Sequence, residues 1–427
     1  MSTEPAETPS EAQLVRQGRK KFLAMAVTYS LGAFNDNFFK QAAALLAVRA
    51  MLEHVQGVAT ILFTLPFILL AAQAGWLADR FPKRSVIIAA KCLEVSAMIL
   101  GALGLWWMDW TLILLMVTLM GVHSTIFGPS LNGSIPELYP ASYVTRANAH
   151  MKVATTAAIL LGYGVAGFLL GVPGDWSGVP LGRVLVAAGA LTVAGIGLAS
   201  AIGCPKRPAA DPRVPFPWAG PWHTLQVLWE IRRDRLLAVT IVLDAFVWFL
   251  GAMQLQLTNV LGLVQLKATD PQTSLLMVAE MVGLAAGGIL AGRLAMRIAW
   301  QRLLAPSATA LGLGLVAMIV LQASGQGWVT AAGLLLFTGL TGGLMLIPLE
   351  SFIQVRPRPE DRGSVIAAGN FAAFIGILIA GGVYLLFYPP GSEATAAWAP
   401  SQVLCGLGGL TLLVAMGVYL ALKGVKE

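Results

Sequence analysis

The stretch GAFNDNFFKQAAALLAV, from Gly32 to Val48, places an acid, a base and two amides inside a long apolar run. Asp36 and Lys40 are four residues apart with the acid first, which is the favourable orientation for a charged pair on a helix. Asn35 and Asn37 add hydrogen-bonding amides beside them. Such a cluster predicts a site for a ligand that carries both signs of charge. The alternative is an internal salt bridge that only holds this helix to its neighbours.

Other charged side chains also lie within apolar runs, where an ionisable residue is expensive unless it is paired or faces water. Lys91 and Glu94 are three residues apart, and we expect them either to contact the ligand or gate, or to pair with each other. Asp244 has no neighbouring base, so it needs a partner on another helix, for which Lys40 and Lys91 are candidates. The complete predicted ligand-binding set is Asn35, Asp36, Asn37, Lys40, Lys91, Glu94, Asp244, Gln254 and Glu280.

The elements that must position these residues are membrane-spanning helices. Of the 427 residues, 57% are hydrophobic and only 11% are charged, whereas about a quarter of a soluble domain is charged. A spanning helix needs about 20 mostly apolar residues. We therefore predict an all-α polytopic membrane protein with twelve transmembrane helices, at 22–50, 57–78, 85–107, 110–131, 149–171, 181–203, 236–262, 272–296, 303–323, 328–350, 363–388 and 398–422.

The distribution of basic residues predicts the orientation of these helices. With a cytoplasmic N-terminus, most of the 28 lysines and arginines fall at the cytoplasmic ends, as the positive-inside rule requires. Only Arg49, Arg183 and Lys267 fall at the outer ends. The net charge of +7 is then a signal for orientation and for contact with anionic lipids, and we expect no binding to nucleic acid. The scattered cysteines and histidines indicate no disulfide framework, metal or cofactor.

The longest polar interruption, rich in proline, lies between six predicted helices and six more. We therefore divide the chain into a cytoplasmic tail at 1–21, an N-terminal half at 22–203, a cytoplasmic linker at 204–235, a C-terminal half at 236–422 and a short cytoplasmic tail at 423–427. We expect the tail at 1–21 to be disordered. The two halves echo each other, because GWLADRFPKRSV after the second helix matches GGILAGRLAMRIAW after the eighth. Parallel repeats of six helices are one architecture of secondary transporters, with the substrate site between the halves.

The loop GWLADRFPKR predicts a cytoplasmic gate rather than a ligand site. Its glycine would permit close helix contact, and Asp79 would accept hydrogen bonds from a neighbouring helix end. The alternative is a positively charged cytoplasmic loop with one stray acid. Together with the acids and bases at the echoing cytoplasmic ends of the two halves, the predicted gating set is Gly75, Asp79, Arg80, Lys83, Arg84, Glu137, Arg146, Glu350 and Arg362.

The same loop resembles the signature between the second and third helices of the major facilitator superfamily, although Pro82 stands where that family usually has glycine. Further stretches are similar to the lysophospholipid transporter branch of that superfamily: AFNDNFFKQAAALLAV, GWLADRFPKRSVIIAAKCLEV, residues 128–169 and DAFVWFLGAMQLQ. In some members the transporter is fused to acyltransferase and acyl-carrier-protein synthetase domains. Because this chain ends at Glu427, we expect no fused enzyme.

The resemblance implies a transporter, not an enzyme, that moves lysophospholipids such as lysophosphatidylethanolamine from the outer to the inner leaflet for re-acylation. It implies alternating access with a lateral opening, in the bacterial inner membrane, with both termini cytoplasmic. Its expected partners are the lysophospholipid substrate, membrane lipids and, functionally, an acyltransferase or acyl-carrier-protein synthetase, and we expect a monomer. Head-group preference and coupling to protons or sodium stay open.

Two other functions fit the residues. A proton-coupled exporter of amphipathic drugs would use Asp36 or Asp244 as its proton site. A lipid-binding partner of an acyltransferase would bind without moving its ligand across the bilayer.

Overall fold

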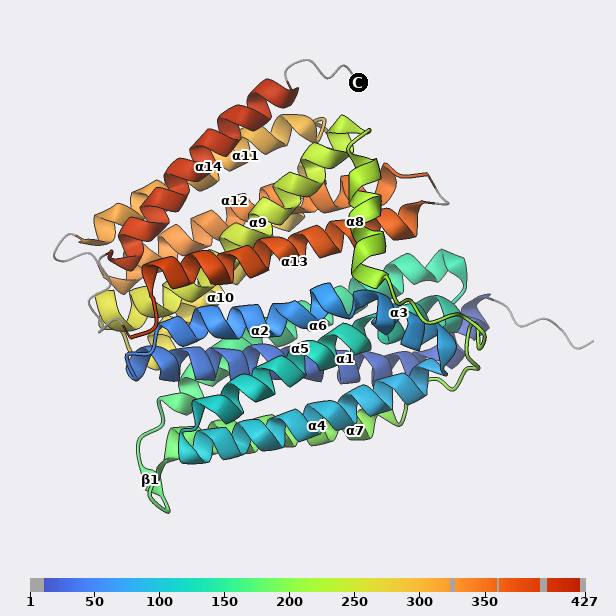
Figure 1. The fold of residues 1–427 in the computed structure, drawn as a ribbon, viewed down its shortest axis with the longest axis horizontal. Helices are drawn as coiled ribbons and strands as arrows, with labels where there is room; N and C mark the ends of the chain where they lie inside the picture. Colours follow the sequence, from blue (N-terminus) through green and yellow to red (C-terminus); the bar gives the residue numbers. More distant parts are fainter. Residues whose placement is uncertain (1–10, 323–326, 359–360, 392–397, 423–427) are drawn as a thin grey trace, which may run out of the picture.

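The fold is a bundle of long helices crossed at one end by a short one (Figure 1). The computed structural model describes residues 11–322, 327–358, 361–391 and 398–422. The helices of the first half are α1 (Glu11–Arg49), α2 (His54–Leu69), α3 (Ala71–Arg80), α4 (Lys83–Trp107), α5 (Trp110–Leu138), α6 (Ala141–Leu170) and α7 (Leu181–Ala201). Between α6 and α7, β1 (Asp175–Trp176) and β2 (Val179–Pro180) form a small antiparallel hairpin, with Asp175 opposite Pro180.

The second part of the chain begins with α8 (Gly220–Ile231), which follows an irregular linker. The long helices after it are α9 (Arg235–Val260), α10 (Asp270–Ala295), α11 (Gln301–Ala317), α12 (Trp328–Val355), α13 (Arg362–Phe387) and α14 (Pro400–Leu422). A π-helical turn, η1 (Leu261–Gln265), extends α9, and a 3₁₀ turn, η2 (Met318–Gln322), extends α11. π-helical turns often occur at functional positions, and η1 follows Asn259, which joins the two halves.

Ten of the described helices are long and apolar enough to cross a membrane, and the pair α2 and α3 forms an eleventh span bent by 53°. The twelfth long helix is α1, whose polar cluster lowers its hydropathy. The chain is therefore an all-helical, multi-pass membrane protein with the predicted elements. Two details differ from prediction: the segment 57–78 is bent at Leu70, and α1 begins at Glu11.

The early start of α1 has a local cause. Residues 11–21 (EAQLVRQGRKK) consist mostly of strong helix formers, so the helix of the first span extends beyond the membrane. The prediction that the whole tail at 1–21 is disordered is therefore wrong from Glu11 onward. The rest of that tail, and the predicted tail at 423–427, lie outside the described residues.

Each half has its own hydrophobic core. Phe38, Phe39 and Met116 belong to a core shared by α1, α4, α5, α6 and α7, whereas Leu257 and Leu335 belong to one formed mainly by α9–α14. The closest helix pair is α10 with α12. A side chain placed at Gly339 would bring its Cβ to 2.0 Å from the backbone oxygen of Glu280. Small residues of this kind allow close helix packing in membranes.

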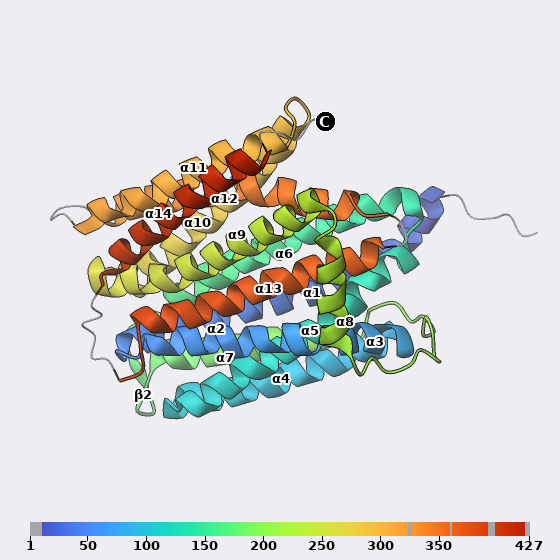
Figure 2. The ribbon, with the colours of Figure 1, turned by 45° about the horizontal axis from the view of Figure 1, so that its top comes forward.

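The start of α1 and the end of α14 lie toward the end of the bundle that carries α3 and α8, and the β hairpin lies at the opposite end (Figures 1 and 2). We call these the linker end and the hairpin end. The linker follows α3: Trp76 donates a hydrogen bond to the carbonyl of Val214 at 3.1 Å, and the amide of Asp211 donates to the carbonyl of Asp79 at 3.0 Å. The linker is thus fixed to the first half before α8 crosses to the second.

Candidate functional site

A central cavity of about 2160 Å³ lies between the two halves. Its walls come from α1, α2, α5 and α6 on one side and from α9, α10, α12 and α13 on the other. Most of the lining residues are apolar or small, about a third are polar, and few of those described carry a formal charge. Three predicted residues of α1, Asp36, Asn37 and Lys40, are half-buried and line it. Such a cavity suits an amphipathic ligand with a small charged part.

Asp36 and Lys40 both line the cavity, and each contacts a different neighbouring side chain. Ser124 of α5 donates a hydrogen bond to one carboxylate oxygen of Asp36 at 2.8 Å, and the other oxygen has no hydrogen-bond partner in the described residues. The ammonium group of Lys40 lies 3.8 Å from the ring centroid of Phe63. Among the ion pairs of the described chain, none joins Asp36 to Lys40. Both charges therefore retain capacity to bind a ligand.

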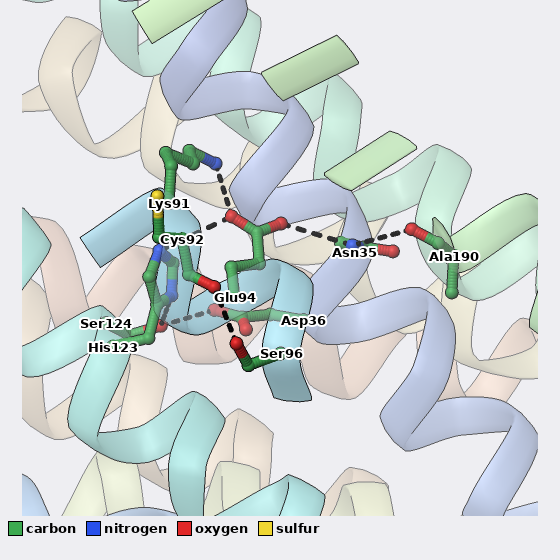
Figure 3. A network of polar contacts seen from close by, with 9 residues as sticks. All are labelled: Asn35, Asp36, Lys91, Cys92, Glu94, Ser96, His123, Ser124 and Ala190. Atoms are coloured by element: carbon green, nitrogen blue, oxygen red, sulfur yellow. Dashed lines mark hydrogen bonds and ion pairs between the residues drawn. The ribbon is translucent and has the colours of Figure 1, made fainter. Parts of the chain in front are cut away.

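Behind this wall lies a buried network of Asn35, Lys91, Glu94 and His123 (Figure 3), and of these four only His123 also lines the cavity. Lys91 and Glu94 of α4 form an ion pair at 2.5 Å, and neither is exposed. Asn35 donates to Glu94 at 3.1 Å and to the carbonyl of Ala190 at 3.1 Å, while the Nε2 of His123 is 3.4 Å from Glu94. These contacts tie α1, α4, α5 and α7 together. The predicted ligand contacts of Asn35, Lys91 and Glu94 stay predictions, and the geometry here is that of a structural network.

The second half contributes fewer charges to the cavity. Glu280 of α10 and Gln254 of α9 are buried and line it, and one carboxylate oxygen of Glu280 has no hydrogen-bond partner in the described residues. Asp244 is 4% exposed and is not part of the lining. Because Lys91 pairs with Glu94, it is not the partner we sought for Asp244. The described cavity lining thus carries Asp36 and Lys40 on α1, Lys152 on α6, Glu280 on α10 and Glu350 on α12.

At the hairpin end, hydrogen bonds between the halves close the cavity. Gln41 donates to Asn259 at 2.9 Å and to Ser274 at 3.2 Å, Asn259 donates to Gln56 at 2.9 Å, and Gln56 donates to Tyr384 at 2.9 Å. Arg49 and Asp270 form an ion pair at 2.6 Å beyond them. These contacts, which we call the outer seal, leave the cavity facing the linker end.

Sequence reasoning missed the outer seal. Gln56 is a single amide in the apolar helix α2, Gln41 directly follows Lys40 in the polar cluster of α1, and Arg49 indicates orientation only. Polar side chains in that setting are a signal for helix–helix hydrogen bonds, but the identity of each partner depends on the tertiary fold.

The predicted gating residues mostly contact their own half. Lys83 forms an ion pair with Glu137, and Arg80 donates to the carbonyl of Pro212 in the linker. Arg84 donates to the carbonyl of Ile202 at 2.7 Å. Asp79 is exposed, and its carboxylate makes no hydrogen bond within the part of the chain that the structure describes. The gating role stays a prediction.

One physical reason given for that gate is wrong in this conformation. A Cβ added at Gly75 would meet nothing within 4 Å, so this glycine does not mediate close helix contact. The other gating residues are dispersed: Glu350 lines the cavity, and Arg146 and Arg362 are exposed. Arg146 lies 5.8 Å from the ring centroid of Tyr143.

A pair at the linker end that sequence analysis did not single out joins α9 to α12. The carboxylate of Asp234 accepts a hydrogen bond from Arg356 at 2.7 Å and caps α9 by accepting one from the amide of Leu237 at 3.2 Å. Partial burial acts to raise the pKa of Asp234, but these hydrogen bonds and the arginine charge outweigh it, so the pKa lies below its usual value.

Comparisons with known proteins agree with this architecture. The family model described as Major Facilitator Superfamily matches residues 22–381. A protein named lysophospholipid transporter LplT from Salmonella arizonae is 30% identical over 396 residues, which cover 91% of this chain and 94% of that protein. The protein of the same name from an Enterobacter species is 27% identical over 409 residues, covering 94% and 96%.

Solved structures with the same fold are more distant in sequence. The nucleoside transporter NupG has a TM-score of 0.68 at 14% identity, and 93% of this chain and 99% of that chain are covered. A D-xylose–proton symporter has a TM-score of 0.69 at 15% identity, covering 93% and 97%. At these identities the likeness extends to the fold alone.

Proposed function

Because this chain belongs to the major facilitator superfamily, in its lysophospholipid transporter branch, we propose that it carries lysophospholipids across the membrane. It is a transporter and not an enzyme. The observation that carries the proposal is the pair of charges on α1, Asp36 and Lys40, half-buried in an otherwise largely apolar cavity between the halves. A lysophospholipid has a small charged head and one apolar chain, and this cavity offers surfaces for both.

The head group is assigned to the α1 side of the cavity. The phosphate binds Lys40, whose present neighbour is the ring of Phe63, a weaker partner for an ammonium group than an anion. An ethanolamine ammonium group binds Asp36 through the carboxylate oxygen that has no partner in the described residues. Glu280 on the opposite wall is the second acid that the amine can reach during the change of conformation.

The direction of transport and the setting follow from the same proposal. Substrate enters from the outer leaflet, the cavity then opens toward the linker end as in this structure, and the lysophospholipid reaches the inner leaflet for re-acylation by an acyltransferase or acyl-carrier-protein synthetase. The protein acts as a monomer in the bacterial inner membrane, with both termini in the cytoplasm. Asp79, Arg80 and their neighbours close the linker end in the opposite conformation.

The proposal is tested by reconstituting the protein in liposomes and following a fluorescent lysophosphatidylethanolamine added to the outer leaflet. We expect the loss of outer-leaflet probe to be faster than in protein-free liposomes, with or without a pH gradient. Cationic drug movement that requires the gradient, without lysophospholipid movement, would identify a proton-coupled exporter. Tight binding of the probe without movement would identify a non-transporting lipid-binding protein.

A further inference from the structure

A transported lysophospholipid must keep its acyl chain out of water while its head is in the cavity, so the chain has to pass between the two halves. The halves meet along two lines, α2 with α13 and α6 with α10. Given the proposed function, one of these two lines has to open to lipid.

The line between α2 and α13 is closed for most of its length. Near the hairpin end, Gly57 packs against Leu385 and Gly381. Further toward the linker end, Phe67 stacks on Phe374 with ring centroids 4.2 Å apart, which joins the two halves.

The same line is covered at its linker end by α8. A Cβ at Gly220, where α8 begins, would lie 2.5 Å from the Cβ of Ala72 of α3. At its other end, Ile231 packs in one cluster with Ile353 and Val365 of the second half. The helix crosses α13 on the face that Figure 1 presents. An acyl chain leaving on this side would have to displace it.

The line between α6 and α10 is closed only near the hairpin end. There Gly167 packs on α10: a Cβ placed on Gly167 would lie 2.4 Å from the hydroxyl of Ser274 and 2.5 Å from the carbonyl oxygen of Asp270. A Cβ placed on Gly164 would lie 3.7 Å from the side chain of Val278. Nearer the linker end, α6 and α10 both contribute to the cavity lining. The lining residues facing this part of the line are Ala157, Leu160, Met281, Ala285 and Gly288.

Apart from Lys152 and Thr156 of α6, the edge of the cavity at this line is apolar, and it continues onto the outside of the protein. Val153 of α6 is 70% exposed and Ile289 of α10 is 62% exposed, and both also line the cavity. Among the described elements, α8 packs mainly on α13, α3, α9 and α2, so it does not cover the line between α6 and α10.

We propose that the acyl chain reaches the lipid through the opening between α6 and α10, at the linker end, while α8 and the Phe67–Phe374 stack keep the other line shut. The occupant of this opening is one hydrocarbon chain, whose head remains near Asp36 and Lys40. The small side chains of Ala157 and Ala285 leave the width that such a chain needs.

Photolabelling of the wild-type protein in liposomes tests the assignment without any substitution. The probe is a lysophosphatidylethanolamine with a photoreactive group at the end of its acyl chain, and unlabelled lysophosphatidylethanolamine serves as competitor. We expect competable labelling within 153–160 and 281–289. Competable labelling in α8 or within 364–374, with transport intact, would overturn the route and leave the proposed function standing. Absence of both competable labelling and transport would overturn both.

A matched pair of substitutions gives a second test. Ala157 and Leu161 are exposed residues one turn apart on α6, but only Ala157 lines the cavity. Ala157→Trp fills the proposed opening, so we expect lysophospholipid transport to fall about tenfold, whereas Leu161→Trp retains transport near the wild-type rate. Binding of glycerophosphoethanolamine, which has the head but no chain, stays unchanged in both variants and reports on folding. The reverse order of transport rates would overturn the assignment.

Discussion

Lys91 and Lys40 are both lysines within membrane-spanning helices, but their surroundings differ, and we infer different roles for them. Lys91 is fully buried and paired with Glu94, so it is held by the protein itself. Lys40 is half-buried in the cavity wall and rests on an aromatic ring. A charge that already has an opposite charge gains little from a ligand, whereas one that lacks it gains a full ion pair. The structure therefore separates a structural lysine from a ligand-binding one.

The buried pair gives a prediction about stability. Lys91→Met leaves Glu94 charged and unpaired, and breaking a buried pair in this way costs about 3–5 kcal/mol. We expect a large fall in the melting temperature of the detergent-solubilised protein. The double variant Lys91→Met with Glu94→Gln removes both charges, so we expect it to recover most of the stability and to transport.

The same double variant can also contradict the structural role of this pair. A double variant that is stable but binds no lysophospholipid would place Lys91 or Glu94 at the ligand rather than in a structural network.

The residues of the cavity wall on α1 were predictable from sequence because a charged cluster in an apolar helix stands out against its background. It was not predictable from sequence that the neighbouring side chains of Asn35 and Asp36 would have different surroundings. These neighbours point to different surroundings: Asn35 to Glu94 and Ala190 of other helices, and Asp36 to Ser124 and the cavity. Which face of α1 meets the cavity depends on the packing of α4, α5 and α7, which periodicity in one helix does not determine.

At the scale of elements, α1, α2, α9, α10 and α13 meet at the outer seal, which holds the hairpin end closed. Asn259 is its centre, since it accepts from Gln41 and donates to Gln56. The following π-helical turn offers a place where α9 can change its geometry. The seal is thus a set of polar contacts that can be exchanged for water when the halves tilt.

Removing the centre of the seal should favour the outward-open conformation. Asn259→Ala deletes two hydrogen bonds, each contributing about 0.5–1.5 kcal/mol, so we expect several-fold faster labelling of a cysteine at Ala44 by a membrane-impermeant maleimide added outside. Thr309→Val, which removes a hydroxyl bonded only within α11, is the control. Unchanged labelling in Asn259→Ala would show that the seal does not hold this conformation.

The start of α9 gives a prediction about acid stability. The folded pKa of Asp234 lies below its unfolded value, so its contribution is present above the unfolded pKa of about 3.9 and is lost as the pH falls through the lower, folded pKa. Asp234→Ala removes the cap and the ion pair. We expect it to lower stability by about 0.5–2 kcal/mol at neutral pH, measured as a shift in unfolding midpoint.

Arg356→Gln separates these two contributions, because it keeps the cap and removes only a half-exposed ion pair. Such pairs contribute about 0–1 kcal/mol, so its effect should be the smaller of the two. An equal effect of both variants would contradict the assignment of the cap.

At the scale of the whole molecule, the number and order of the long helices could be predicted because each needs only a run of apolar residues. The bend between α2 and α3 and the position of α8 across α13 could not. They depend on how the linker is fixed to α3 and on contacts such as Gly220 with Ala72. The same contacts make the two lines between the halves unequal, which a sequence repeat alone would not suggest.

The most direct test of the central claim is lysophosphatidylethanolamine transport by Asp36→Asn and Lys40→Met, with Thr60→Val as the control. Thr60 also lines the cavity, but its hydroxyl is bonded to the carbonyl of Gln56 within its own helix, at 2.9 Å. Loss of a hydrogen bond to a charged group costs about 1.5–3 kcal/mol, so each of the first two variants should transport about 10- to 100-fold more slowly, and the control should match the wild type. Wild-type rates in Asp36→Asn and Lys40→Met would contradict the account.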